Sequence, residues 1–431
     1  MLSQTSAGLY TILTIEREVL VSTFSTVVWW FVGLCLALAL VVPSGYSLGA
    51  AGLLLLSLAV PLLGAYRLGS EEKQLIATLA GYFVLMALLI YLDGWHYREL
   101  DRPLRFMLAV PVLLLLLRCS GPRGALWLGS ILGACGAFAF AVYDRVILDE
   151  PRAEGLHNAV MFGNIAMLLG LINAAAMLYF LSQRRYLGLA CAVLGFVSGV
   201  MASLFSGTRG GWLVLPCLLL FLGWQGRELL GKRGIVLAAF VVIAGAVAIL
   251  NSSTLGVAER LSLAAAGAQD YWAGKVDVSV GGRLEMWKVN LQFFLSSPIV
   301  GVGEYQGLAL KNTLAAAGLM SAVDAQYTHA HNEYVDALGL RGLVGFAALL
   351  AVYLVPLRLF CAKLAHYKDN WAVRSYALAG AVVPLCFMIF ALTQSMFSHN
   401  SGVMLYVFPV VFFWAAVRLE EAKARECVTS S

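Results

Sequence analysis

The stretch AVMFGNIAMLLGLINAAAMLYFL, Ala159–Leu181, contains no charged residue. A helix of about 20 apolar residues crosses the hydrocarbon core of a bilayer, so this stretch predicts a membrane-spanning helix. The whole chain has a similar character: of its 431 residues, 61% are hydrophobic and 12% are charged. Soluble domains carry about 25% charged residues. The composition therefore excludes a soluble enzyme and a nucleic-acid-binding protein, and it predicts an all-α polytopic membrane protein.

Further apolar runs lie on both sides of this stretch, and together they predict about twelve transmembrane helices. The predicted spans are Val27–Val42, Gly49–Tyr66, Leu75–Leu92, Leu104–Leu117, Ala125–Tyr143, Ala159–Leu181, Leu187–Leu204, Trp212–Trp224, Gly234–Leu250, Leu338–Leu357, Tyr376–Thr393 and Ser401–Val417.

The distribution of Lys and Arg predicts the orientation. If the N-terminus is cytoplasmic, most of the basic residues in the short connections fall on the cytoplasmic side, as the positive-inside rule requires. The opposite short connections hold fewer basic residues: Arg98, Arg102, Arg105, Arg145, Arg152 and Arg209. We therefore expect both termini to be cytoplasmic.

One connection is much longer and more polar than the others, and the predicted orientation places it outside the cytoplasm. Its segment GGRLEMWKVNLQFFLSSP, Gly281–Pro298, predicts an amphipathic helix with one apolar stripe. The stripe would hold Leu284, Trp287, Leu291, Phe294 and Leu295. The sequence thus predicts three parts: spans one to nine in residues 1–250, a folded external loop domain in 251–334, and spans ten to twelve with a short cytoplasmic tail in 335–431.

Two arginines on the predicted external side occupy positions suited to an anion. Arg209 lies among three glycines in SGTRGGW, Ser206–Trp212, where the backbone can approach a ligand closely. Arg283 lies in the first turn of the predicted amphipathic helix, where the helix dipole disfavours a cation but attracts an anion. Each could equally be an ordinary interfacial arginine.

A histidine lies where the polar loop becomes the tenth span, in THAHNEYVDALGLRGLVGF, Thr328–Phe346. An unperturbed imidazole has a pKa near 6.5, so His331 is a candidate general base, although it could also be a satisfied interfacial histidine. His329 and His331 alternate, but no carboxylate follows them at ligand spacing, and the loop acids are dispersed. We therefore expect no catalytic metal and no other cofactor.

These residues resemble a known family. His331-Asn332, nine further residues and then Gly342-Leu343-Val344-Gly345 are similar to the H-[NSQ]-x9-G-x-x-[GTY] motif of bacterial O-antigen ligases. The other His-Asn pairs, His157-Asn158 and His399-Asn400, lack this spacing. The stretch SPIVGVGEYQ, Ser297–Gln306, is similar to a Gly-rich segment that precedes the histidine in the same superfamily.

The resemblance implies a GT-C-type, metal-independent, inverting glycosyltransferase of the bacterial inner membrane, with its active site on the periplasmic face. The donor would be O-antigen linked to undecaprenyl pyrophosphate, and the acceptor would be a sugar hydroxyl of lipid A-core. By resemblance, His331 matches the essential histidine, and Arg209 and Arg283 match two arginines of the family. Lys288 could share the role of Arg283. Further candidates for substrate binding are Asn332, Glu304, Tyr305, His399 and His157.

Three other functions stay open. An O-antigen polymerase uses the same donor but extends a second lipid-linked chain, and a protein O-oligosaccharyltransferase of the same superfamily modifies serine or threonine. The third alternative is a twelve-span transporter or flippase. Transporters of that size often consist of two related halves with charges at the midplane.

Overall fold

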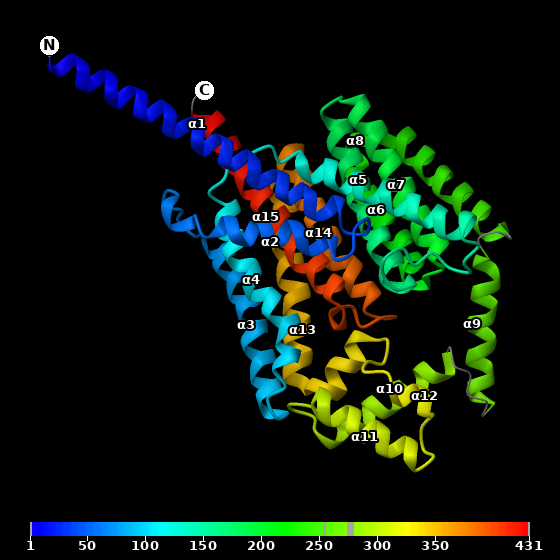
Figure 1. The fold of residues 1–431 in the computed structure, drawn as a ribbon. Helices are drawn as coiled ribbons and strands as arrows, with labels where there is room; N and C mark the ends of the chain where they lie inside the picture. The colour runs from blue at the N-terminus through cyan, green and yellow to red at the C-terminus, as the bar shows by residue number, and fades with distance from the viewer. Residues whose placement is uncertain (1, 253–255, 274–279, 430–431) are drawn as a thin grey trace.

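The computed structural model describes residues 2–252, 256–273 and 280–429. Within these ranges the chain is helical and contains no β-strand (Figure 1). Nine described helices are long and apolar enough to cross a membrane. They are α1 (Leu2–Ala37), α3 (Ser70–Leu92), α5 (Ala125–Val142), α6 (Ala159–Ser182), α7 (Tyr186–Ser206), α8 (Arg209–Asn251), α13 (Glu333–His366), α14 (Trp371–Phe390) and α15 (Asn400–Thr429). The chain is therefore a polytopic membrane protein.

The nine long helices differ from the twelve predicted spans for two reasons. The second and fourth predicted spans fall on α2 (Gly45–Ser57) and α4 (Asp101–Leu116), which have only 13 and 16 residues. The eighth and ninth both fall on α8, where the backbone of Gly231 is non-helical, with φ 64° and ψ 173°. A residue with these angles interrupts the helix between the two apolar runs. The total of twelve spans stays a prediction.

The most buried spans form the centre of the bundle. The apolar segments of α15 and α14 are 89% and 83% buried, whereas the most apolar segment of α8 is 0% buried and presents its side chains outward. Small residues allow neighbouring helices to approach closely. A Cβ atom on Gly199 of α7 would lie 2.6 Å from the Cα atom of Gly170 in α6.

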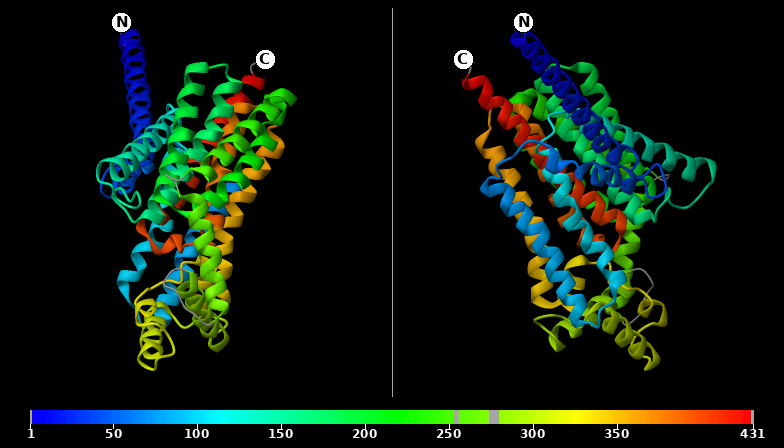
Figure 2. Two further views of the ribbon diagram at one scale, coloured as in Figure 1. Left: turned by 90° about the vertical axis from the view of Figure 1, so that its right-hand side faces the viewer. Right: turned by 60° about the vertical axis from the view of Figure 1, so that its left-hand side comes forward.

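The two ends of the molecule differ. Helix α1 begins and α15 ends at one end, and the loop domain lies at the other (Figures 1 and 2). This domain contains α9 (Val257–Trp272), α10 (Val280–Ser296), α11 (Glu304–Ala316) and the short α12 (Ala322–Ala325). The arrangement agrees with the predicted separation of the termini from the long loop.

The predicted amphipathic helix exists as α10, but its predicted apolar stripe was wrong. Met286, Val289 and Phe293 are buried, whereas Leu291 and Leu295 are 55% and 72% exposed. The reason is the close packing of α10 against α13, where a Cβ on Gly339 would lie 2.5 Å from the carbonyl oxygen of Asn290. This contact determines which face is buried, and the helix's own leucine pattern does not.

Candidate active site

Four arginines line one cavity of about 570 Å³ at the end of the molecule that carries the loop domain. We call it the arginine cavity. Arg152 lies in the connection before α6, Arg209 begins α8, Arg260 belongs to α9, and Arg283 lies in the first turn of α10. The structure thus brings the two predicted arginines together and adds two that the sequence analysis did not select.

The charge of this cavity is strongly positive. None of the four arginines forms an ion pair with a carboxylate among the residues that the structure describes. Burial lowers the pKa of Arg152, Arg260 and Arg283, and the charge of Arg209 lowers each further. The N-terminal end of α8, which adds partial positive charge, also lines the cavity. Such a site favours a multiply charged anion.

The glycine-rich turn before α8 fits closely against its neighbours. Gly207 has φ 65°, and a Cβ there would lie 2.6 Å from the guanidinium carbon of Arg260. A Cβ on Gly210 would lie 2.3 Å from Oγ1 of Thr393. Thr208 Oγ1 donates a hydrogen bond to the carbonyl oxygen of Ala159 at 2.8 Å. The small residues therefore let Arg260 and Thr393 approach the turn that carries Arg209.

His331 lies beside this cavity in a strained backbone conformation. Its φ is 53°, which is uncommon for a residue with a side chain. Its Nδ1 lies 2.7 Å from Oε1 of Gln394, and Nε2 of Gln394 lies 3.0 Å from Nε2 of His399. Thr393, which precedes Gln394, lines the arginine cavity. With Oε1 as acceptor, Nδ1 of His331 carries the proton and Nε2 retains its lone pair.

The electrostatic surroundings keep His331 neutral. Burial and the charge of Arg283 lower its pKa, against the opposing effect of the hydrogen bond with Gln394. The imidazole is therefore unprotonated at neutral pH and can accept a proton from a hydroxyl group.

Residues on either side of His331 hold it in place. Asn332 caps α13 by accepting hydrogen bonds from the backbone N–H groups of Tyr334 and Val335 at 3.1 and 3.2 Å. The backbone N–H of Ala330 donates to the two carboxylate oxygens of Asp336 at 2.9 and 3.1 Å. The side chain of Asn332 is therefore engaged in capping α13, and this structural role accounts for a polar residue directly after His331.

The two glycine motifs meet in the structure. Gly342 interrupts α13 with φ 60° and ψ −162°, a conformation open essentially to glycine alone. The segment after α10 docks at this break: the N–H groups of Leu343 and Val344 donate to the carbonyls of Pro298 and Ile299, and that of Gly303 donates to Leu340. The docked segment connects α10, which carries Arg283, to the helix that follows His331.

Other predicted site residues lie elsewhere. Lys288 has a 62% exposed side chain, pairs with Glu285 at 3.8 Å and does not line the arginine cavity. Tyr305 stacks on His96 with ring centroids 4.0 Å apart. His157 and His399 line a separate cavity of about 720 Å³, which we call the imidazole cavity.

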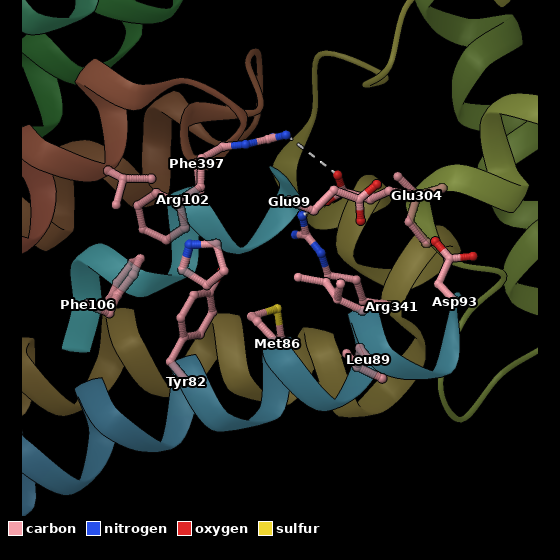
Figure 3. A pocket seen from close by; sticks show the side chains of 15 residues that line it. Tyr82, Met86, Leu89, Asp93, Glu99, Arg102, Phe106, Glu304, Arg341 and Phe397 are labelled. Atoms are coloured by element: carbon pink, nitrogen blue, oxygen red, sulfur yellow. Dashed lines mark hydrogen bonds and ion pairs between the residues drawn. The ribbon is translucent and has the colours of Figure 1, made fainter. Parts of the chain in front are cut away.

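Glu304 belongs to a third cavity of about 520 Å³, between α3, α4 and α13. Figure 3 shows Asp93, Glu304 and Arg341 on one side of it and Tyr82, Phe106 and Phe397 on the other. Glu304 pairs with Arg341 and, at 3.8 Å, with Arg102. Burial opposes ionisation of Glu304, but these two charges hold its pKa below the usual value. The carboxylate thus links the loop domain to α4 and α13.

Sequence reasoning missed Arg152, Arg260 and Gln394 as members of the site. Arg152 was counted only among the external basic residues, and Arg260 has no motif around it. Gln394 lies directly after the apolar run of α14 and is 2% exposed. The sequence did offer one indication for Gln394, because a polar residue at the end of an apolar span is a candidate functional residue.

Part of the chain that forms this site is similar to a known family. Residues 194–350 match the O-antigen ligase family. The matched region begins within α7 and ends within α13, so it contains Arg209, Arg260, Arg283 and His331. The similarity to this family covers less than half of the chain.

Two curated proteins are similar to the chain. An uncharacterized protein of Haemophilus influenzae is 26% identical over 382 residues, which cover 87% of this chain and 94% of that protein. An O-antigen ligase of Escherichia coli K12 is 25% identical over 221 residues, which cover 50% of this chain and 51% of that protein.

Proposed function

We propose that the protein is an O-antigen ligase that transfers a polysaccharide from undecaprenyl pyrophosphate to a sugar hydroxyl of lipid A-core. The observation that carries the proposal is the arginine cavity directly beside a neutral, oriented His331. The family match over residues 194–350 and the similarity to the Escherichia coli ligase support the same reaction class.

The arginine cavity suits the leaving group. Rupture of the bond between the anomeric carbon and the pyrophosphate oxygen leaves both electrons on a lipid pyrophosphate with additional negative charge. Arginine provides a planar fork of donors, and charge-assisted hydrogen bonds to phosphate are about twice as strong as neutral ones. Four such side chains around one cavity stabilise this charge without requiring a metal or another cofactor.

His331 suits the attacking group. Its Nε2 would take the proton of the acceptor hydroxyl while the hydroxyl oxygen forms the new bond to the anomeric carbon. The products are the glycosylated acceptor, a protonated His331 and the lipid pyrophosphate. Direct displacement by the acceptor gives inversion at the anomeric carbon. A positioned general base contributes typically 10²–10⁴-fold to the rate.

The placement of charge supports an enzyme over a transporter or flippase. The described buried charged residues lie near helix ends, in connections or in the loop domain; for example, Lys363 and Glu421 pair at 2.8 Å near the ends of α13 and α15. Transport pathways instead place charges near the middle of the membrane. A polymerase or a protein O-oligosaccharyltransferase would share the arginine cavity and His331, so the acceptor decides among the enzymes.

The test is a transfer assay with purified protein in liposomes that contain undecaprenyl-pyrophosphate glycan and lipid A-core, with EDTA present. Glycan on lipid A-core is the expected product. Longer lipid-linked glycan without a lipid A-core product would indicate a polymerase. Absence of transfer from an intact donor by folded protein would contradict an enzyme of this class.

A further inference from the structure

We infer that Asp336 is a positioning residue that holds His331 against its hydrogen-bond partner Gln394. The inference rests on the proposed function, because it assigns to Asp336 a role in the same reaction. Asp336 lies in the first turn of α13 and is 3% exposed. It lines neither the arginine cavity nor the imidazole cavity, so it would act through His331 and not on a substrate.

The backbone of His331 needs support from its neighbours because it is strained. Its φ is 53°, and such a conformation persists only where the surrounding structure determines it. Side chains hold both backbone groups of the preceding residue, Ala330. The N–H of Ala330 donates to the two carboxyl oxygens of Asp336 at 2.9 and 3.1 Å. Its carbonyl oxygen accepts a hydrogen bond from Nε1 of Trp287 at 2.9 Å. Ala330 is 0% exposed, so water does not compete for these bonds.

The same carboxyl group also holds the connection that carries Gln394. Oδ2 of Asp336 accepts a hydrogen bond from Oγ of Ser395, which is the residue directly after Gln394 and is 0% exposed. One side chain thus bonds to the residue before His331 and to the residue after Gln394. Between these two anchors, Nδ1 of His331 lies 2.7 Å from Oε1 of Gln394. Loss of the carboxyl group would therefore release both members of the pair.

Trp287 connects this arrangement to the arginine cavity. Trp287 and Arg283 are four residues apart on α10, so their side chains lie on the same face of the helix. Arg283 lines the arginine cavity, and its charge acts on His331. The bond from Trp287 to the carbonyl of Ala330 thus ties the helix that carries Arg283 to the segment that Asp336 holds.

Several charged and titratable groups lie around His331 and influence its pKa. They are His329 and Tyr327 on its own segment, Arg283 of α10, Lys311 of α11, which bonds to the carbonyl of Tyr327, and His399 before α15. The variants used below leave all of these groups unchanged. A difference in the pKa of His331 between matched variants therefore measures how close a charge at position 394 lies to its ring.

The experiment titrates His331 by NMR in full-length protein labelled with ¹⁵N-histidine, in detergent and without substrate. The chain has six histidines, and His331→Gln identifies the signal. Gln394→Glu should raise the pKa of His331 by about one unit or more, because a carboxylate then faces Nδ1. Combined with Asp336→Leu, which removes both anchoring bonds, Gln394→Glu should raise the pKa by about half as much or less, because the interaction weakens with distance.

The conservative variant Asp336→Asn tests whether hydrogen bonds explain the effect. Its amide oxygen can accept from the N–H of Ala330, and its amide nitrogen can donate to Oγ of Ser395. It should therefore restore the full effect of Gln394→Glu. In the transfer assay, Asp336→Leu should lower kcat roughly 10²-fold with little change in either KM, because a catalytic group misplaced by about 1 Å has this cost. Asp336→Asn should recover most of kcat.

Asp93→Leu is the matched control for general damage. Asp93 is also a buried acid that accepts a backbone N–H, that of Tyr305 at 2.8 Å, but it bonds to neither anchor of the His331 pair. Asp93→Leu should leave the effect of Gln394→Glu at full size, even if thermal unfolding shows a loss of stability. If Asp336→Leu does not fold, Ser395→Ala removes one of its two bonds and should also reduce the effect.

Three results would overturn the inference. They are an equal effect of Gln394→Glu with and without Asp336→Leu, a loss in Asp336→Asn as large as in Asp336→Leu, and an equal reduction in Asp93→Leu. In the case that Asp336→Leu does not fold, an undiminished effect of Gln394→Glu in Ser395→Ala would overturn it as well. The NMR titration needs no substrate, so it separates the two proposals. Protein that shows the expected coupling but transfers no glycan would contradict the proposed function and leave the role of Asp336 in holding His331 intact.

Discussion

The paired geometry of guanidinium and phosphate makes each arginine of the cavity sensitive to conservative change. Arg283→Lys keeps the charge but loses the planar fork that binds two oxygens at once. We expect kcat for transfer to fall roughly 10²-fold, comparable to the loss of one preorganised donor to a developing oxyanion. Steady-state kinetics in liposomes would measure it.

Lys288→Ala is the matched control on the same helix, because Lys288 is exposed and does not line the cavity. Activity near the wild-type value is expected for this control. If Lys288→Ala lost as much activity as Arg283→Lys, the anion would be bound on a different face of α10.

His331 sets the expected pH dependence. Only its neutral form can accept a proton, and burial holds its pKa below the ordinary value of 6.5. The rate should therefore be constant above neutral pH and should fall as the pH drops through a midpoint below 6.5. The pH profile of kcat/KM measures this midpoint. A rate that increased as the pH fell would show that the protonated imidazole is the active form.

Gln394 is a positioning residue with a distinct signature. Gln394→Glu places a carboxylate 2.7 Å from Nδ1 of His331, which stabilises the protonated imidazole. The acid limb of the pH profile should move to higher pH by about one unit or more. Gln394→Leu should lower kcat without such a movement. An unshifted profile in Gln394→Glu would mean that Gln394 does not contact His331 in the active protein.

At the scale of elements, the break in α13 holds the site together. Gly342→Ala places a side chain in a conformation open essentially to glycine and 2.4 Å from the carbonyl of Ile299. We expect the free energy of unfolding to fall by about 1–3 kcal/mol and the transfer activity to fall strongly. Thermal unfolding in detergent and the transfer assay would measure these effects.

Gly81→Ala is the comparison variant, since Gly81 lies within α3 and a Cβ there meets nothing within 4 Å. It should be neutral or slightly stabilising. A tolerated Gly342→Ala would show that the docked segment after α10 does not position His331.

The predictability of the elements varied for physical reasons. The nine long apolar helices could be predicted from hydropathy alone, because a bilayer requires long apolar helices. Hydropathy did not predict that the second and fourth spans would fall on the shorter helices α2 and α4. The orientation of α10 could not be predicted from hydropathy, because the contact of α10 with Gly339 of α13 decides which residues are buried.

The arginine cavity combines four segments that lie far apart in the chain. The local glycine and helix patterns were enough to select Arg209 and Arg283 as candidate anion-binding residues. Arg152 and Arg260 could not be selected in this way, because they join the site only through tertiary contacts such as that between Arg260 of α9 and the turn at Gly207.

At the scale of the whole molecule, the two ends should lie on opposite sides of the membrane. Leu319 in the loop domain is 69% exposed, so Leu319→Cys offers an accessible thiol there. In intact cells with a permeable outer membrane, this thiol should react with a membrane-impermeant maleimide, and a fluorescent protein fused after Ser431 should be protected from external protease. Labelling of this thiol only after lysis of the cells would contradict the predicted orientation.

The central claim is that an acceptor hydroxyl, deprotonated by His331, displaces the lipid pyrophosphate held in the arginine cavity. The most direct measurement is a single-turnover transfer to lipid A-core, with the anomeric configuration of the product determined by NMR. We predict inversion of the donor linkage and a rate about 10²–10⁴-fold lower in His331→Ala. A product that retained the donor configuration, or an unchanged rate in the folded variant, would contradict the mechanism.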